Sequence, residues 1–128
     1  MRLLLDTCAF LWLAAEPKRL GPRARKAIDA RDAVLVVSDV SIWEVCLKWQ
    51  AGKLTLPAPP RRWFGEQIAR WGVRPLPLTA EHLFRATELP VLHRDPFDRL
   101  LVAQAIEGDL TLVTPDPAIV AYPVAVLW

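Results

Sequence analysis

The sequence predicts an α/β fold, in which helices cover both faces of a mostly parallel central sheet. Short runs of aliphatic residues, typical of strands buried on both faces, alternate along the chain with segments whose apolar residues recur at helical spacing. This alternation favours parallel strands, because each helix returns the chain across the sheet before the next strand begins. The length of 128 residues fits one domain, so we expect a single domain over residues 1–128.

The N-terminal part of the chain indicates two strands and two helices. Residues 3–5 form a leucine run typical of a buried strand, and residues 7–16 then form a helical segment that Pro17 ends. Residues 22–31 predict a second helix with a proline in its first turn, where the missing amide hydrogen is not needed. Residues 33–37 are aliphatic throughout and mostly β-branched, as expected for a covered parallel strand.

The middle of the chain predicts two helices and a weak strand. Residues 41–52 place apolar side chains at helical spacing and end at a glycine. Residues 56–61 form a proline-rich loop, and residues 62–71 again carry apolar side chains on one helical side. Residues 73–78 are expected to form only a short edge strand, because their two prolines cannot donate hydrogen bonds to a neighbouring strand.

The C-terminal part contains the clearest helix of the chain. Residues 79–89 predict a helix with Thr79 as its N-cap. Residues 95–108 are apolar nearly all round after the first turn, so we expect this helix to be deeply buried. Residues 110–113 and 124–127 are short apolar runs that predict the last two strands.

Composition limits the class of protein. Hydrophobic residues make up 53% of the chain, which favours a well-packed core over disorder, and the net charge of +2 does not by itself indicate a nucleic-acid binder. The two cysteines, Cys8 and Cys46, lack metal-ligand spacing, so we expect reduced thiols. No apolar run is long enough for a membrane span and the start is too short for a signal peptide, so we expect a cytoplasmic protein.

Several acidic residues follow the predicted strands closely. Asp6 comes directly after the first strand, Asp39 and Glu44 follow the second, and Asp116 comes three residues after the strand at 110–113. Asp98 lies in the first turn of the most buried helix. Ligands of open α/β sheets bind at the carboxyl ends of the strands. We therefore expect acids from separate segments to meet at one edge of the sheet.

Each acid also has a purely structural explanation. Ser41 and Glu44 have the spacing of a capping box, and Glu44 can pair with Lys48 one turn later. Asp116 precedes a proline and can cap a short helical turn, while Asp6 can simply end a strand. Taken singly, these explanations compete with a functional role for each residue.

Two neighbouring acids can be separated by their expected roles. Asp95 precedes Pro96 and is expected to be an N-cap that faces its own helix, whereas Asp98 is free to point into a cleft. Asp39 is expected to be a turn residue. Two carboxylates about 4 Å apart repel by roughly 4 kcal/mol at an effective dielectric of 20, so converging acids need protons or a cation. An all-oxygen ligand set suits Mg²⁺ or Mn²⁺.

Three long segments carry a family resemblance. The runs LLLDTCAFLW, VSIWEVCLKWQAGKLTL and LPLTAEHLFRATELPVLHRDPFDRLLVAQAIEGDLTLVTPD occur in this order and cover most of the chain. They resemble the PIN-domain ribonucleases of the VapC toxin type. The resemblance implies a three-layer α/β/α sandwich around a five-stranded parallel sheet, metal-dependent cleavage of RNA that leaves 5′-phosphate and 3′-hydroxyl ends, inhibition by a cognate antitoxin, and a homodimer.

The resemblance also implies the identity of the site. The family's four acids, arranged around Mg²⁺ or Mn²⁺, fall motif by motif on Asp6, Glu44, Asp98 and Asp116. Asp6 and Asp98 would be the firmest metal ligands, while Glu44 and Asp116 could act through bound water. Many relatives carry histidine at the position of Cys8, which affects only a local contact.

Other polar residues are weaker candidates for the site. Thr7 and Thr114 flank the acids and can bind a carboxylate, water or a substrate phosphate, and Arg99 can contact RNA phosphate. His82 and His93 are expected to be surface or loop residues. The densest basic stretch is expected to be a solvated helix face rather than an RNA-binding surface, and comprises Lys18, Arg19, Arg23, Arg25, Lys26 and Arg31.

The tryptophans suggest a surface for a partner. Most of the six are expected in the core. Four of them can also line an apolar groove for a partner helix, which the resemblance assigns to an antitoxin: Trp12, Trp43, Trp49 and Trp63.

Four other functions compete with that of a ribonuclease. A haloacid-dehalogenase-type phosphatase needs a second aspartate two residues after the first, where this chain has Cys8. A phosphoacceptor receiver domain needs an acidic pair near the first strand, and Asp6 stands alone. A catalytically inactive PIN-fold binding module and a DNA nuclease remain the alternatives to an endoribonuclease.

Overall fold

The computed structural model describes all residues, 1–128, and has a five-stranded sheet in the order β3-β2-β1-β4-β5. Every neighbouring pair of strands is parallel, so the predicted parallel sheet is confirmed. In chain order the strands are β1 Arg2–Leu5, β2 Val34–Ser38, β3 Arg74–Leu76, β4 Thr111–Val113 and β5 Val126–Leu127. The two-proline segment forms the edge strand β3, as expected.

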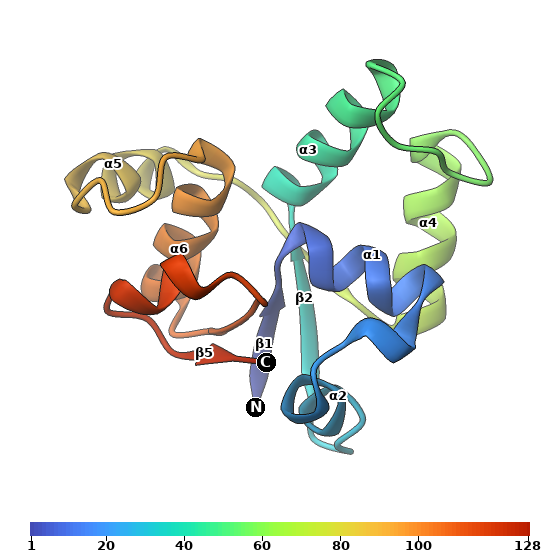
Figure 1. Cartoon of the computed structure of the whole chain (residues 1–128), viewed down its shortest axis with the longest axis horizontal. Helices are drawn as coiled ribbons and strands as arrows, with labels where there is room; N and C mark the ends of the chain where they lie inside the picture. Colours follow the sequence, from blue (N-terminus) through green and yellow to red (C-terminus); the bar gives the residue numbers. More distant parts are fainter.

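Helices cover both faces of this sheet, as the sequence predicts. The α-helices are α1 Thr7–Ala15, α2 Pro22–Ile28, α3 Asp39–Gln50, α4 Pro60–Trp71, α5 Ala80–Glu88 and α6 Pro96–Gly108, and the 3-10 helices are η1 Pro17–Arg19 and η2 Pro117–Ala121. Figure 1 shows α1, α2 and α4 on one side of the central strands and α5 and α6 on the other. The result is an α/β/α sandwich.

The alternation of side chains along the strands builds two cores. Leu3 and Leu5 of β1 point into the core under α1, α2 and α4, together with Phe10, Trp63 and other buried residues. Leu4, between them, points into the opposite core against α6. The solid apolar runs of β1 and β2 are therefore explained by burial on both faces.

One helix begins earlier than its sequence predicts. Ser38, at the end of β2, caps α3 by accepting a hydrogen bond from the Val40 amide at 2.9 Å. Asp39 is therefore the first residue of the helix and not a turn residue, and its carboxylate accepts a bond from the Leu78 amide at 3.3 Å. Ser41 lies inside the helix, so the predicted capping box between Ser41 and Glu44 is wrong.

The apolar helix at the C-terminal part is buried as expected. Residues 101–105 of α6 are all buried, and Gln104 among them contacts the Ser38 hydroxyl across the sheet face. Thr79 caps α5 as predicted. None of the helices has the length and apolar character needed to cross a membrane.

Candidate metal centre

Four carboxylates from separate segments line one cavity at the carboxyl end of the sheet. Asp6 directly follows β1, and Asp116 lies three residues after β4. Glu44 lies in the second turn of α3, and Asp98 lies in the first turn of α6. The cavity has a volume of about 320 Å³. Figure 1 shows why this edge collects them, because α1 and α3 both begin where β1 and β2 end. The remaining lining residues are Thr7, Cys8, Leu11, Lys48, Asp95 and Pro115.

Helix capping fixes three of the cavity's acids in place. The Asp6 carboxylate accepts a hydrogen bond from the Ala9 amide at 2.7 Å and so caps α1, which the sequence did not predict. Asp95 caps α6, and Asp116 caps η2, as predicted for both. A cap uses only part of a carboxylate's four or so acceptor sites, so these residues can cap a helix and still present oxygen to the cavity.

Burial and repulsion between neighbouring acids disfavour the ionised form of two carboxyl groups in the cavity. Burial raises the pKa of Asp6 to about 6, and the charges of Glu44 and Asp116 add to the shift. Burial also raises the pKa of Asp98 to about 7, with a further contribution from the Asp95 charge. Both carboxyl groups therefore keep a proton up to a higher pH than ordinary carboxyl groups do, and a bound cation can take the place of that proton.

Glu44 forms an ion pair with a lysine that lines the cavity. The Lys48 ammonium lies 2.9 Å from the Glu44 carboxylate, one turn further along α3, as the sequence predicts. The hydrogen bond to Glu44 raises the pKa of Lys48, so the lysine stays charged. Half of the Lys48 side chain is exposed, so its charge is available to a substrate as well as to Glu44.

A histidine that the sequence predicts as a surface or loop residue contacts two of the cavity's acids. His93 lies in the loop before α6, and its Nε2 is 2.6 Å from Asp116 Oδ2 and 3.2 Å from Asp98 Oδ2. Ligand atoms of these three residues all lie within 4.8 Å of one another. One feature of the sequence could have indicated this position. His93 lies two residues before Asp95, the N-cap of α6, where its ring nitrogen can accept a hydrogen bond from the Asp95 amide.

The bond between His93 and Asp116 affects both groups. The hydrogen bond to Asp116 raises the pKa of His93. Protonation of the ring would place a hydrogen on Nδ1, which faces the hydrogen of the Asp95 amide. The repulsion between these two N–H groups opposes the rise in the pKa of His93. Burial acts to raise the pKa of Asp116, but the hydrogen bonds from His93 and the Ala118 amide lower it. Asp116 therefore holds its negative charge more easily than Asp6 or Asp98 does.

The two threonines predicted beside the acids form hydrogen bonds with other residues of the chain. The buried Thr7 hydroxyl donates to Ser41 at 3.0 Å and so ties the start of α1 to α3. Thr114 is 1% exposed, its hydroxyl accepts the Asp116 amide at 3.1 Å, and its side chain also hydrogen-bonds Asp6. Thr114 therefore links two of the acids.

Arg99 is not brought to the cavity. Its guanidinium donates to the Ala86 carbonyl at 3.3 Å, and its side chain lines a separate hollow against α5. The basic residues between Lys18 and Arg31 are all exposed, as expected for a solvated face. Arg19 among them stacks over Trp12, with its guanidinium carbon 4.3 Å from the ring centre.

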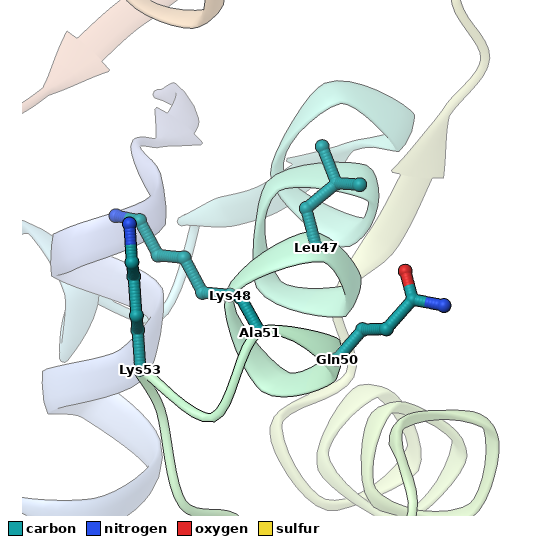
Figure 2. Close-up of a pocket in the computed structure, with 5 residues that line it drawn as sticks. All are labelled: Leu47, Lys48, Gln50, Ala51 and Lys53. Carbon is teal, nitrogen blue, oxygen red and sulfur yellow. The ribbon is translucent and has the colours of Figure 1, made fainter.

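A shallow hollow of about 400 Å³ adjoins the acidic cavity along α3. It is lined by Leu47, Lys48, Gln50, Ala51 and Lys53, so Lys48 borders both spaces. Figure 2 shows the side chains of Lys48 and Lys53 extending to the same side of the helix, with their ammonium groups at the same end of the hollow. Positive charge therefore lies directly beside the acids.

A larger apolar groove of about 480 Å³ lies between α1, α4 and the loop that joins α3 to α4. Trp12 and Trp63 both line it, in part as the sequence predicts. Trp43 and Trp49 do not line it, and their side chains are exposed on α3 instead. The predicted four-tryptophan groove is therefore wrong in half of its members, because Trp43 and Trp49 lie on α3, which contributes no residue to this groove.

The donor chemistry of the cavity fits a hard divalent cation. The cavity offers carboxylate oxygens and no thiolate, because burial raises the pKa of the Cys8 thiol to about 11 and keeps it protonated. Buried carboxylates with raised pKa values are stabilised by a cation that replaces their protons. Oxygen-only ligand sets favour Mg²⁺, Mn²⁺ or Ca²⁺ over zinc or copper.

Comparison with known proteins gives a consistent assignment. The family profile of the PIN domain matches residues 3–124. The chain is 36% identical over 114 residues to Ribonuclease VapC22 of Mycobacterium tuberculosis, which covers 88% of this chain and 85% of the relative.

Solved structures share the fold at lower identity. VapBC2 from Rickettsia felis, bound to a DNA fragment from its promoter, has a TM-score of 0.71 at 16% identity, covering 98% of this chain and 97% of that one. A toxin–antitoxin complex from Klebsiella pneumoniae has a TM-score of 0.64 at 16% identity, covering 98% and 96%. With the parallel sheet and the four converging acids, these matches show that the chain belongs to the PIN-domain family, in its VapC-type branch.

Proposed function

We propose that the chain is a metal-dependent endoribonuclease and the toxin of a type II toxin–antitoxin system. The observation that carries the proposal is the meeting of Asp6, Glu44, Asp98 and Asp116, four acids from distant segments, in one cavity. The similarity to a VapC ribonuclease supports RNA as the substrate.

The four acids are the proposed ligands of Mg²⁺ or Mn²⁺, either directly or through water. The bound cation would supply an activated water and charge stabilisation for phosphodiester hydrolysis. The protein's own contribution is to keep the acids oriented before the metal arrives: the Ala9 amide and Thr114 hold Asp6, and the Ala118 amide and His93 hold Asp116.

Lys48 is proposed to contact the phosphate backbone of the RNA substrate. Its ammonium lies at the rim of the acidic cavity, beside Lys53, where an RNA backbone entering the site would carry negative charge (Figure 2). Lys48 also balances part of the negative charge of Glu44. Both roles place it close to the reaction without making it a proton donor, because its pKa is raised.

Two protein partners are proposed. The apolar groove with Trp12 and Trp63 is proposed to bind an apolar segment of a cognate antitoxin, in line with the similarity to VapBC complexes. A second copy of the chain is proposed to cover the exposed apolar side chains of α5 and the loop after it, which are Leu83, Phe84, Val91 and Leu92.

The test of the activity is cleavage of single-stranded RNA with Mg²⁺ or Mn²⁺, with and without EDTA. Asp6→Asn and Asp98→Asn are expected to lose activity by about 100-fold or more, because each removes a proposed ligand from the metal. Asp32→Asn is the matched control, since that side chain is 84% exposed and its carboxylate lies 3.6 Å from the N-terminal ammonium group of Met1, and the variant should stay fully active.

The same assay separates the alternatives. Cleavage of single-stranded DNA but not of RNA would indicate a DNA nuclease. An intact fold with no metal-dependent cleavage of either polymer would indicate an inactive binding module. Full activity of both Asp6→Asn and Asp98→Asn would exclude this cavity as the active site.

A further inference from the structure

His93 is held more tightly than a loop residue needs to be. Its side chain is only 17% exposed. The amides of Leu92 and His93 both donate to the hydroxyl of Tyr122, at 3.0 and 2.9 Å. Tyr122 is itself buried and lies six residues after Asp116. The loop that carries His93 is therefore fixed to the segment that carries Asp116.

The backbone around His93 determines which ring nitrogen carries the proton. His93 Nδ1 accepts a hydrogen bond from the Asp95 amide at 3.0 Å, so Nδ1 must present a lone pair. In the neutral ring the hydrogen is then on Nε2, which faces Asp116 Oδ2 at 2.6 Å. His93 is thus set up as a donor toward Asp116, and its Nε2 has no lone pair to offer a metal ion.

Asp116 is held at both of its oxygens but keeps acceptor capacity. Oδ1 accepts the Ala118 amide at 2.9 Å, and Oδ2 faces the His93 ring. A carboxylate has about four acceptor sites, so each oxygen retains one for a cation or its bound water. The two bonds together fix the plane of the carboxylate relative to the cavity.

We propose that His93 is a positioning residue, which orients Asp116 toward the metal through its Nε2–H and does not bind the metal itself. This inference rests on the metal site of the proposed function and extends it to a residue outside the four acids. Hydrogen-bond partners of metal-ligating carboxylates and histidines typically change metal affinity or activity by about 10–100-fold when they are removed.

Two near-isosteric substitutions separate the two bonds of the ring. The amide of glutamine reaches to about the position of Nε2, so His93→Gln can still donate to Asp116 but no longer accepts from the Asp95 amide. The amide of asparagine reaches to about the position of Nδ1, so His93→Asn keeps the bond to Asp95 and loses the donor to Asp116. The folding of both variants is checked by thermal unfolding without metal.

The first measurement is Mn²⁺ affinity of the full chain by titration calorimetry. His93→Asn is expected to bind Mn²⁺ about 10–100-fold more weakly than the wild type, and His93→Gln within about threefold of it. RNA cleavage at saturating Mn²⁺ should differ less between the variants than their metal affinity does. Equal Mn²⁺ affinities of the wild type and both variants would overturn the inference.

The second measurement is the nitrogen coupling of bound Mn²⁺ by pulsed electron paramagnetic resonance. The wild type should show no coupling of the strength given by a directly bound imidazole. Such a coupling, lost in both variants, would make His93 a ligand and overturn the inference while leaving the proposed function intact. A wild-type chain that binds no Mn²⁺ would overturn both the proposed metal site and this inference.

Discussion

Asp6 and Asp98 are the two acids of the site whose ionised forms are destabilised by their surroundings. Their pKa values are raised to about 6 and about 7, because burial in a cavity shared with other acids penalises the charged form. Such raised pKa values are expected at a cation-binding site, since a bound cation stabilises the ionised carboxylates.

The metal-free protein should lose stability as the pH rises from 5 to 8. The folded state binds protons at Asp6 and Asp98 more tightly than the unfolded chain does, so this stability is complete below about pH 4 and disappears through pH 6 to 7. The lowered pKa of Asp116 acts oppositely, but only below this window. Urea unfolding in EDTA at pH 5 and 8 measures the effect.

Mn²⁺ and one variant serve as controls for this pH dependence. Saturating Mn²⁺ should restore the stability lost at pH 8, because the deprotonated acids then bind the ion. Asp98→Asn should flatten the dependence on pH in EDTA. A metal-free protein that is more stable at pH 8 than at pH 5 would contradict the raised pKa values.

The sequence allowed the acids to be predicted but not the histidine. Asp6, Glu44 and Asp116 follow strands, and the carboxyl ends of parallel strands share one edge, so their meeting could be inferred from topology. His93 lies in a loop without periodicity, and its ring is fixed by the Asp95 amide and by Tyr122, which lies 29 residues away. Such contacts depend on tertiary structure alone.

At the scale of elements, α3 links the acids to the basic hollow beside them. Because residues four apart share one side of a helix, Glu44 faces the cavity and Lys48 lies above it at 2.9 Å. The position of α3 in turn depends on its cap at Ser38 and on the buried contact between Ser38 and Gln104 of α6. The cap was misplaced by three residues in the sequence-based prediction, because Ser41 with Glu44 has the same spacing as a true capping box.

Lys48→Gln should affect metal and RNA in opposite directions. Removing the ammonium beside Glu44 should tighten Mn²⁺ binding by about 3–10-fold, because a like charge no longer repels the ion. The KM for RNA should rise, since a proposed phosphate contact is lost, and the slope of affinity against salt should fall by about one. Calorimetry and cleavage kinetics at several salt concentrations measure both effects.

Lys53→Gln provides the matched control. Lys53 lines the same hollow but does not pair with Glu44, so its loss should leave Mn²⁺ affinity unchanged and weaken only RNA binding. If both substitutions changed Mn²⁺ affinity to the same extent, the Glu44–Lys48 pair would have no specific effect on the metal.

At the scale of the whole molecule, the order of strands and helices could be predicted from the sequence, whereas the identity of the exposed apolar side chains could not. The alternation of aliphatic runs and helical periods predicts the α/β/α sandwich, because a parallel sheet with helices on both faces buries these runs. Which tryptophans share a groove depends on how each helix is rotated against the sheet, and so Trp43 and Trp49 could not be placed from sequence. The same holds for the exposed apolar side chains of α5.

The chain is expected to form a dimer through α5 and the loop after it, and Phe84→Glu should weaken it. Phe84 is 62% exposed among other apolar side chains, and a charge placed there would be buried without a partner. A central contact residue is worth about 2 kcal/mol or more, so the dimer dissociation constant should rise by at least about 30-fold. Sedimentation at several concentrations measures it.

Trp49→Glu is the control for surface hydrophobicity. Trp49 lies near the end of α3 and is 41% exposed, and it belongs neither to α5 nor to the loop after it. This variant should dimerise like the wild type. A wild-type chain that stays monomeric at all concentrations, or an equal effect of both substitutions, would contradict the proposed dimer surface.

Anomalous diffraction from a crystal of the chain grown with Mn²⁺ most directly tests whether the four acids form a metal centre. The expected result is a manganese peak in the cavity, with carboxylate oxygens of Asp6 and Asp98 about 2 Å from it and His93 Nε2 still on Asp116. A cavity without manganese at saturating concentration, or a peak held by other residues, would contradict it.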